Sequence, residues 1–293
     1  MASGKRNVWR ALMAEPLGIM GGVIVLAFVV MALFAPWLAP YDPFKIDVMH
    51  KFSGPSLAHW AGTDQLGRDL LSRIIFGART ALGVAVTATG VAGLVGILLG
   101  LIAGYGPRWL DSLLILCFDS MTSLPMIMFA LAVITVLGPS TATLILVIIL
   151  VSIPGYARFI RAQTLSLVRS DFIMAEQAMN ASNARIILRH LLPNVVGQLL
   201  VVLSMDIPVV ITIEAGLSFL GLGVRPPLAS WGTLIQDGYQ YLSDSWVPVV
   251  VSSLALAVAT LGFTLFGEAL RDAMDEGIPV DGFFQWSYAD NIE

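Results

Sequence analysis

The sequence predicts an all-α membrane protein with six transmembrane helices. Of its 293 residues, 57% are hydrophobic and only 12% are charged, and the mean hydropathy is +0.84. Soluble domains carry about 25% charged residues, so this chain has too little charge to cover the surface of a soluble globule. The net charge of -4 is weak and mixed in sign. This composition excludes a soluble enzyme, a disordered protein and a nucleic-acid-binding protein.

The predicted spans are the long stretches without charged residues. A helix needs about 20 apolar residues to cross a hydrocarbon core. The first stretch is too long for the apolar part of a signal peptide, so we expect it to be retained. The uncharged run 120–157 is too long for one crossing, and the turn signal at residues 138–140 divides it. The six spans are then residues 17–38, 81–105, 110–137, 141–157, 195–220 and 246–266.

The distribution of basic residues predicts the orientation. Six crossings place both termini on the same side of the membrane. With cytoplasmic termini, ten of the 16 Lys and Arg residues fall in cytoplasmic segments and six fall outside. This agrees with the excess of basic residues found on the cytoplasmic side of membrane proteins.

The outer segment, residues 39–80, is polar and long. Its second half, residues 64–79, has apolar residues at helical spacing, with Arg68, Asp69 and Arg73 off the apolar stripe. We expect an amphipathic helix that lies along the outer interface and leads directly into the second span.

The cytoplasmic segment, residues 158–193, is too long and too patterned for a simple connector. Residues 180–183 suit caps and turns, a second helix starts at about Ala184, and Pro193 opens the fifth span. The segment is therefore predicted to be a helix-turn-helix that protrudes into the cytosol, either as a pair of connecting interfacial helices or as a docking surface for a soluble partner. Its first helix has an apolar stripe at Leu165, Val168, Phe172, Ala175 and Met179.

Several kinds of catalytic or cofactor-binding site are missing from the sequence. None of the three lysines stands in the Gly-rich context of a phosphate-binding loop. The three histidines show no metal-ligand spacing. We therefore expect a non-enzymatic chain that binds no cofactor and no metal.

Two acidic residues, Asp206 and Glu214, fall within the fifth predicted span. A carboxylate at mid-bilayer costs about 2.5–3.5 kcal/mol on insertion scales, so such residues face a bundle interior or water. Eight residues apart, they point about 80° from one another on a helix. They could line a translocation pathway, or they could be satisfied by neighbouring helices. An ion-coupled secondary transporter that uses both is the alternative function.

Three long strings resemble the permeases of the dipeptide/oligopeptide/nickel family of ABC importers. They are GTDQLGRDLLSRIIFGARTAL (62–82), GLSFLGLGVRPPLASWG (216–232) and FGEALRDAMD (266–275). They occur in the family's order, and the resemblance covers nearly the whole chain up to about Asp275. The chain is most similar to the second of the two paired permease types, which has an extended segment after its first span.

The resemblance implies a type I ABC importer permease architecture with a cytosolic coupling loop. Residues 174–176 stand at the family's Glu-Ala-Ala position, and Asn180 stands at its Gly position, where the turn often needs a positive φ that Asn tolerates. The resemblance also implies a division of the chain into 1–80, a permease core 81–275 with its coupling loop at 158–193, and a cytosolic tail 276–293. The expected ATPase-coupling residues are Ala175, Glu176, Met179, Asn180, Ala181, Ser182 and Asn183.

The implied partners are a second homologous permease, two cytosolic ATPase subunits, an extracytoplasmic substrate-binding protein and the lipid bilayer, with no nucleic acid. ATP and Mg²⁺ would bind to the ATPase subunits. The implied location is the bacterial inner membrane. Di- or oligopeptides are the expected substrates in a family that also covers nickel chelates and some sugars.

Overall fold

The computed structural model describes residues 15–274 and contains no β-strand among them. Five helices are long and apolar enough to span a membrane, and a bent pair makes a sixth span if it is counted as one. The basic residues at positions 5, 6 and 10 and the predicted tail 276–293 lie outside the described residues. The five long helices are α2 (Pro16–Leu33), α4 (Leu70–Tyr105), α7 (Thr141–Val168), α10 (Leu192–Phe219) and α12 (Val247–Met274).

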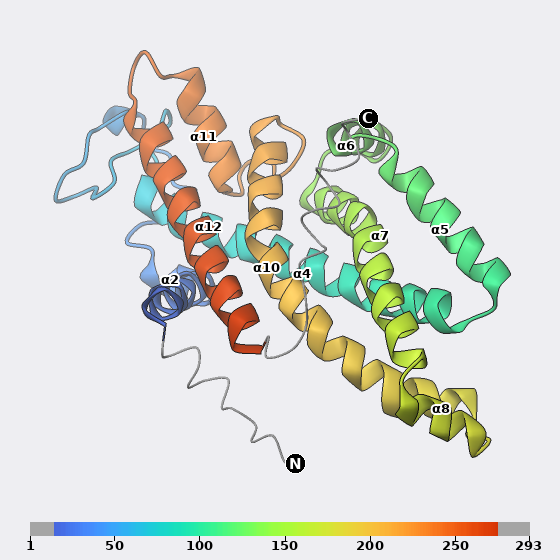
Figure 1. The fold of residues 1–293 in the computed structure, drawn as a ribbon. Helices are drawn as coiled ribbons and strands as arrows, with labels where there is room; N and C mark the ends of the chain where they lie inside the picture. Colours follow the sequence, from blue (N-terminus) through green and yellow to red (C-terminus); the bar gives the residue numbers. More distant parts are fainter. Residues whose placement is uncertain (1–14, 275–293) are drawn as a thin grey trace, which may run out of the picture.

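Shorter helices connect the spans and lie at the two ends of the molecule (Figure 1). α8 lies at one extremity and α11 near the other, with residues 39–69 beside α11. The shorter elements are α3 (Ala35–Leu38), η1 (Val48–His50), α5 (Arg108–Thr122), α6 (Met126–Leu137), α8 (Asp171–Ala178), α9 (Asn183–Ile186), the π-helical turn η2 (Ile187–Leu191) and α11 (Trp231–Gln240).

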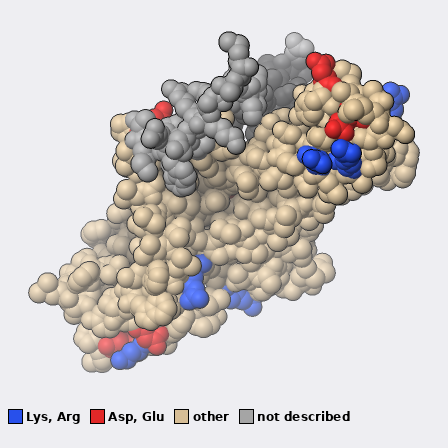
Figure 2. Space-filling model, turned by 90° about the horizontal axis from the view of Figure 1, so that it is seen from below, with Lys and Arg blue, Asp and Glu red and all other residues tan. Residues whose placement is uncertain are grey.

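Charged side chains gather toward the two ends of the face shown in Figure 2 and leave a broad uncharged band between them. This is the distribution that a bilayer requires, because charged groups at hydrocarbon depth are costly. The long helices also expose many apolar side chains, which is expected where lipid or another membrane subunit replaces water. All-helical spans satisfy their backbone polar groups internally, as the hydrocarbon region demands.

α4 runs through the centre of the bundle and packs closely along α7. Gly96, Gly100 and Gly104 of α4 face Tyr156, Ile160 and Thr164 of α7, one turn apart on each helix. A Cβ at Gly100 would lie 2.6 Å from the Cβ of Ile160 and 2.7 Å from the carbonyl oxygen of Ala157. Small residues at these positions therefore allow the two backbones to touch, as the glycine-rich sequence of this span indicates.

The third predicted span, residues 110–137, is a bent pair of helices and not one continuous helix. α5 ends at Thr122, α6 starts at Met126, and their axes differ by 88°. The cause is Pro125, which has no N–H for a helix bond and forces the preceding residue away from helical dihedrals. Pro154 and Pro208 lie inside α7 and α10 without ending them.

The outer segment also differs from the expected interfacial helix. Helix α4 starts only at Leu70, where the Asp69 carboxylate caps it by accepting a hydrogen bond from the Ser72 N–H at 2.8 Å. Arg68 and Arg73, expected on the solvent side, are 7% and 2% exposed. The sequence pattern could not show that residues 39–69 fold back and cover this face.

A buried ionic cluster holds the folded-back segment in place. The Asp64 carboxylate lies 2.6 Å from Nε of Arg68 and 3.4 Å from Nε of Arg73. Arg68 also reaches Asp237 of α11 at 3.7 Å. Nearby, the Trp231 Nε1–H of α11 donates a hydrogen bond to the Ile74 carbonyl of α4 at 3.1 Å. These contacts join the outer segment, α4 and α11 into one unit.

The seam between α4 and α7 predicts that Gly100→Ala destabilises the assembled protein by about 1–3 kcal/mol, the usual cost of overpacking. The added Cβ would meet backbone and Cβ atoms that cannot move aside cheaply. The measurement is the thermal unfolding midpoint of the purified complex. Gly90→Ala, on the same helix with no atom within 4 Å of the added Cβ, is the matched control. Equal midpoints for the two variants would contradict the close-packing argument.

Candidate functional site

The protruding element is residues 169–191, which join α7 to α10 at one end of the bundle. It consists of α8, a turn, α9 and the π-helical turn that continues into α10 (Figure 1). The predicted helix-turn-helix is thus present. Because both ends of the element run into long helices, any force applied to it is transmitted directly to two spans.

The single helix predicted through residues 165–179 is interrupted. The backbone turns at Arg169 and Ser170, and Ser170-Asp171 starts a new helix. The predicted apolar stripe is therefore not one face, and that part of the prediction was wrong. Phe172 and Met179 are 47% and 71% exposed, whereas Ile173 is fully buried. Helical spacing applies only within an unbroken helix, and the break shifts which side chains point inward.

Two helix caps placed back to back form the turn of the element. Asn180 has φ +60°, as expected for the position where the family has Gly. The Ala181 N–H bonds to the Glu176 carbonyl and the Asn180 N–H to the Gln177 carbonyl, the bond pattern of a Schellman motif. Ser182 then caps α9 by accepting a hydrogen bond from the Arg185 N–H.

The inner face of the element is fixed to the bundle. Ile173, Ile186 and Leu191 are at most 1% exposed and pack in one apolar cluster with residues of α4, α7 and α10. Ala181 is half-buried against the same cluster. The Tyr105 hydroxyl at the end of α4 donates a hydrogen bond to Oδ1 of Asn183 at 3.1 Å.

Glu176 connects α8 to the second half of the element. Its carboxylate lies 3.3 Å from Nε2 of His190 and 3.8 Å from Nε of Arg185. Glu176 and His190 are both half-buried, while the Arg185 side chain is 55% exposed. Glu176 therefore stabilises the shape of the element from its inner side.

The element exposes several apolar side chains among polar ones such as Gln177 and Arg189. Met174 and Leu188 are 49% and 65% exposed, in addition to Phe172 and Met179. Ala175 of the predicted set is also exposed. Clusters of exposed apolar side chains on a polar extremity mark interaction sites, because water contact with them is unfavourable.

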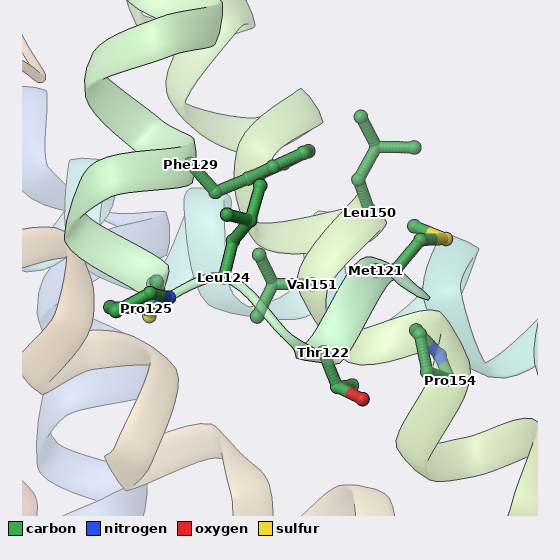
Figure 3. A pocket seen from close by; sticks show the side chains of 9 residues that line it. Met121, Thr122, Leu124, Pro125, Phe129, Leu150, Val151 and Pro154 are labelled. Carbon is green, nitrogen blue, oxygen red and sulfur yellow. The ribbon is translucent and has the colours of Figure 1, made fainter. Parts of the chain in front are cut away.

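A cavity of about 340 Å³ lies where α5 bends into α6, against the middle of α7. In Figure 3 the side chains of Leu124, Phe129 and Val151 converge, and Thr122 lies at one edge. Its size is near the lower end of the roughly 300–1,000 Å³ range of ligand pockets. The lining residues are Met121, Thr122, Leu124, Pro125, Met126, Phe129, Leu150, Val151 and Pro154.

Two ion pairs link α5 to α7 below this cavity. Arg161 binds Asp111 through two hydrogen bonds of 2.5 and 2.7 Å. Arg158 binds Asp119 through a single hydrogen bond of 2.8 Å from Nη2. Our sequence reasoning missed these pairs and the cavity. The available signals were Asp119 inside an apolar run, and Pro125 and Pro154 near the middle of their spans.

Residues 96–278 match the model of the binding-protein-dependent transport system inner membrane component, and residues 5–55 match the N-terminal transmembrane domain of oligopeptide transport permease C. The chain belongs to this family of membrane transport components. The first match covers the protruding element, the α5–α6 bend and the seam between α4 and α7. The chain is thus a multi-pass permease subunit of a bacterial transport system.

Curated relatives align with the permease over most of its length. It is 37% identical to the dipeptide transport system permease protein DppC of Alkalihalophilus pseudofirmus, over 92% of this chain and 89% of the relative. It is 38% identical to the glutathione transport system permease protein GsiD of Escherichia coli O6:K15:H31, with the same coverage. The di/tripeptide transport system permease protein DppC of Pseudomonas aeruginosa is 35% identical, over 92% and 91%.

A solved structure supports the fold assignment. The permease resembles a chain of the MetNI methionine ABC transporter with a TM-score of 0.53 and 16% sequence identity. The alignment covers 70% of this chain and 96% of that chain. At this identity the likeness concerns the fold, which is that of a type I ABC importer permease.

The two acidic residues in α10 occupy different environments. Glu214 is fully buried, and its Oε1 accepts hydrogen bonds of 2.7 Å from the hydroxyls of Ser218 and Ser230. Oε1 is therefore satisfied by its neighbours, as in the second of the two interpretations, whereas the buried Oε2 has no hydrogen-bond partner among the described residues. Asp206 is half-buried and lies next to the Tyr156 hydroxyl of α7. A place for Asp206 on the pathway stays a prediction.

The positive φ of Asn180 predicts that Asn180→Val disrupts the turn, because a β-branched residue is strongly disfavoured there. Asn180→Gly should keep the turn intact, since glycine adopts this conformation without a steric penalty. The measurement is the rate of limited proteolysis within residues 179–183 of the purified complex. We expect about a tenfold faster cleavage for the valine variant only, based on the 1–2 kcal/mol cost of left-handed backbone. Equal rates for the two variants would count against the capped-turn geometry.

Proposed function

We propose that this permease forms half of the translocation pathway of an ABC importer for di- or oligopeptides and couples that pathway to cytosolic ATPase subunits. The observation that carries the proposal is the protruding element of residues 169–191. It exposes apolar side chains among polar ones, and its inner face packs against α4, α7 and α10. An element built in this way is suited to be bound and moved by a separate protein.

The complete transporter would contain a second homologous permease, two ATPase subunits and a substrate-binding protein. The ATPase subunits would bind ATP and Mg²⁺ and contact residues 169–191 in the cytosol. The binding protein would approach the opposite end, where the buried ionic cluster of Asp64 gives the outer segment a defined shape. The permease would lie in the bacterial inner membrane with both termini in the cytoplasm. Peptide as the substrate class is supported by the dipeptide and di/tripeptide permeases among the relatives.

The coupling mechanism follows from how the elements are joined. α8 follows α7 after a two-residue turn, and η2 continues directly into α10. A displacement of the element therefore tilts both helices. The two ion pairs and the adjacent packing transmit the tilt of α7 to α5, and thus to the bend at the cavity. Rocking of spans in this way is the usual basis of alternating access. The permease would perform no covalent chemistry.

The alternative, an ion-coupled secondary transporter, requires Asp206 and Glu214 to exchange ions with water. The burial of Glu214 and its two serine hydrogen bonds argue for a structural role instead. Uptake by the reconstituted complex should stop when ATP is depleted while the ion gradient is held. Continued uptake under these conditions would support the carrier and reject the importer.

The exposed apolar face predicts the effect of Met179→Glu. This substitution should reduce recovery of the ATPase with the purified permease at least about tenfold, because the contact would desolvate an unpaired charge. Membrane insertion should be unchanged, since Met179 is 71% exposed. The measurement is the ATPase-to-permease ratio after affinity purification.

Two control variants make this result specific. Met179→Leu keeps the surface apolar and should retain the ATPase. Leu57→Glu places the same charge on a 98% exposed leucine at the opposite end, and it should also retain the ATPase. Normal ATPase recovery with Met179→Glu would show that this face is not the docking surface.

A further inference from the structure

The two ion pairs that link α5 to α7 differ in their solvent exposure. Ion pairs that only stabilised the packing of these helices would not need to differ in this way. The Asp111 and Arg161 side chains are 21% and 27% exposed, and they form a bidentate pair. Asp119 and Arg158 are 62% and 42% exposed, and their pair uses one oxygen of the carboxylate. Two similar pairs on the same two helices thus include one that is closed and one that is open.

The open pair lies near one end of the apolar part of α7, toward the protruding element. Arg158 is 17 residues from the start of α7, which corresponds to roughly 26 Å along the helix. The apolar core of a bilayer is about 30 Å thick. Arg158 therefore lies near the edge of the hydrocarbon core, where charged side chains contact water at little cost. The open pair is accessible to water at the end of the bundle that carries residues 169–191.

The open pair also borders the cavity at the α5–α6 bend. Arg158 donates a second hydrogen bond, of 3.1 Å, from Nη2 to the hydroxyl of Thr122, and Thr122 lines the cavity. Asp119 precedes Thr122 by about one turn of α5, and Arg158 follows Pro154 by one turn of α7. The open pair is therefore joined through Thr122 to a cavity whose other walls are apolar.

The open pair has further hydrogen-bonding groups. Within residues 15–274, the guanidinium of Arg158 uses only Nη2 in its hydrogen bonds, and the carboxylate of Asp119 uses only Oδ1. The remaining guanidinium N–H groups and the second oxygen are available to a ligand.

We propose that this cavity is a transit site for short zwitterionic peptides, with Arg158 binding the terminal carboxylate and Asp119 binding the terminal ammonium group. The apolar walls, formed by side chains such as Leu124, Phe129 and Val151, hold the peptide side chain. Planar guanidinium groups suit carboxylates, and the cavity volume suits a short peptide. When no peptide is present, the two residues pair with each other, so neither charge is left without a partner. The proposal rests on the proposed peptide-import function and adds a residue-level basis for its substrate class.

The test compares peptides with free and blocked termini in the complete reconstituted transporter. Uptake is measured with saturating binding protein loaded with a dipeptide, its N-acetyl form or its C-terminal amide. The wild-type complex should import the free dipeptide about tenfold faster than either blocked form, which is the loss expected for one charge-assisted hydrogen bond. Equal import of all three would overturn the proposal.

Each variant should affect one terminus only. Arg158→Gln should remove the preference for the free carboxylate over the amide and keep the preference for the free amine. Asp119→Asn should do the reverse. Arg161→Gln and Asp111→Asn, on the same helices but in the closed pair, should change uptake of the three peptides by the same factor. If Arg158→Gln and Asp119→Asn reduced the uptake of all three peptides by the same factor, the open pair would only stabilise the packing of α5 on α7. That result would overturn the proposal.

A measurement on the wild-type complex covers the case in which a variant does not fold. A dipeptide with a photoreactive side chain should label residues 121–129 or 150–154 during ATP-driven uptake. Labelling of the permease only outside these residues would overturn the transit site. Failure of the wild-type complex to import any peptide with ATP would instead reject the proposed function, so the two failures are distinguishable.

Discussion

The close packing of α4 against α7 is the contact on which the other features of this permease depend. It requires glycine at three successive turns of α4, because the facing Cβ atoms of α7 occupy the space that a side chain would need. α7 contributes one wall of the cavity, carries both arginines of the ion pairs and leads into the protruding element. A single rigid contact therefore sets the position of the proposed pathway relative to the proposed coupling surface.

The two ends of the bundle reach rigidity by different physical means. At the outer end, a buried cluster around Asp64 ties the folded-back segment to α4 and α11. Buried charges need partners, so this cluster also specifies how the segment folds back. At the other end, apolar residues such as Ile173 and Ile186 anchor α8 and α9. Apolar side chains such as Phe172 and Met179 remain exposed there among polar ones, which is appropriate for a surface that another protein covers.

Two prolines shape the middle of the molecule. Pro125 ends one helix and produces the 88° bend, whereas Pro154 is accommodated within α7. The cavity lies between them, next to an ion pair that is open to solvent. Backbone irregularity at membrane depth is tolerated where it is covered by protein or borders water. The bend, the cavity and the open pair are therefore consistent with one aqueous route through the bundle.

The sequence by itself determined the membrane class, the position of most spans, the existence of a structured loop at residues 158–193 and the left-handed turn at Asn180. These properties are local, because span length, charge distribution and turn chemistry follow from neighbouring residues. The tertiary structure alone decided that Arg68 and Arg73 are buried, that Phe172 and Met179 face outward and that Glu214 is held by two serines. It also decided that Asp119 and Arg158 meet, although they are 39 residues apart. Such outcomes depend on which helices pack together, and a periodic pattern does not contain that information.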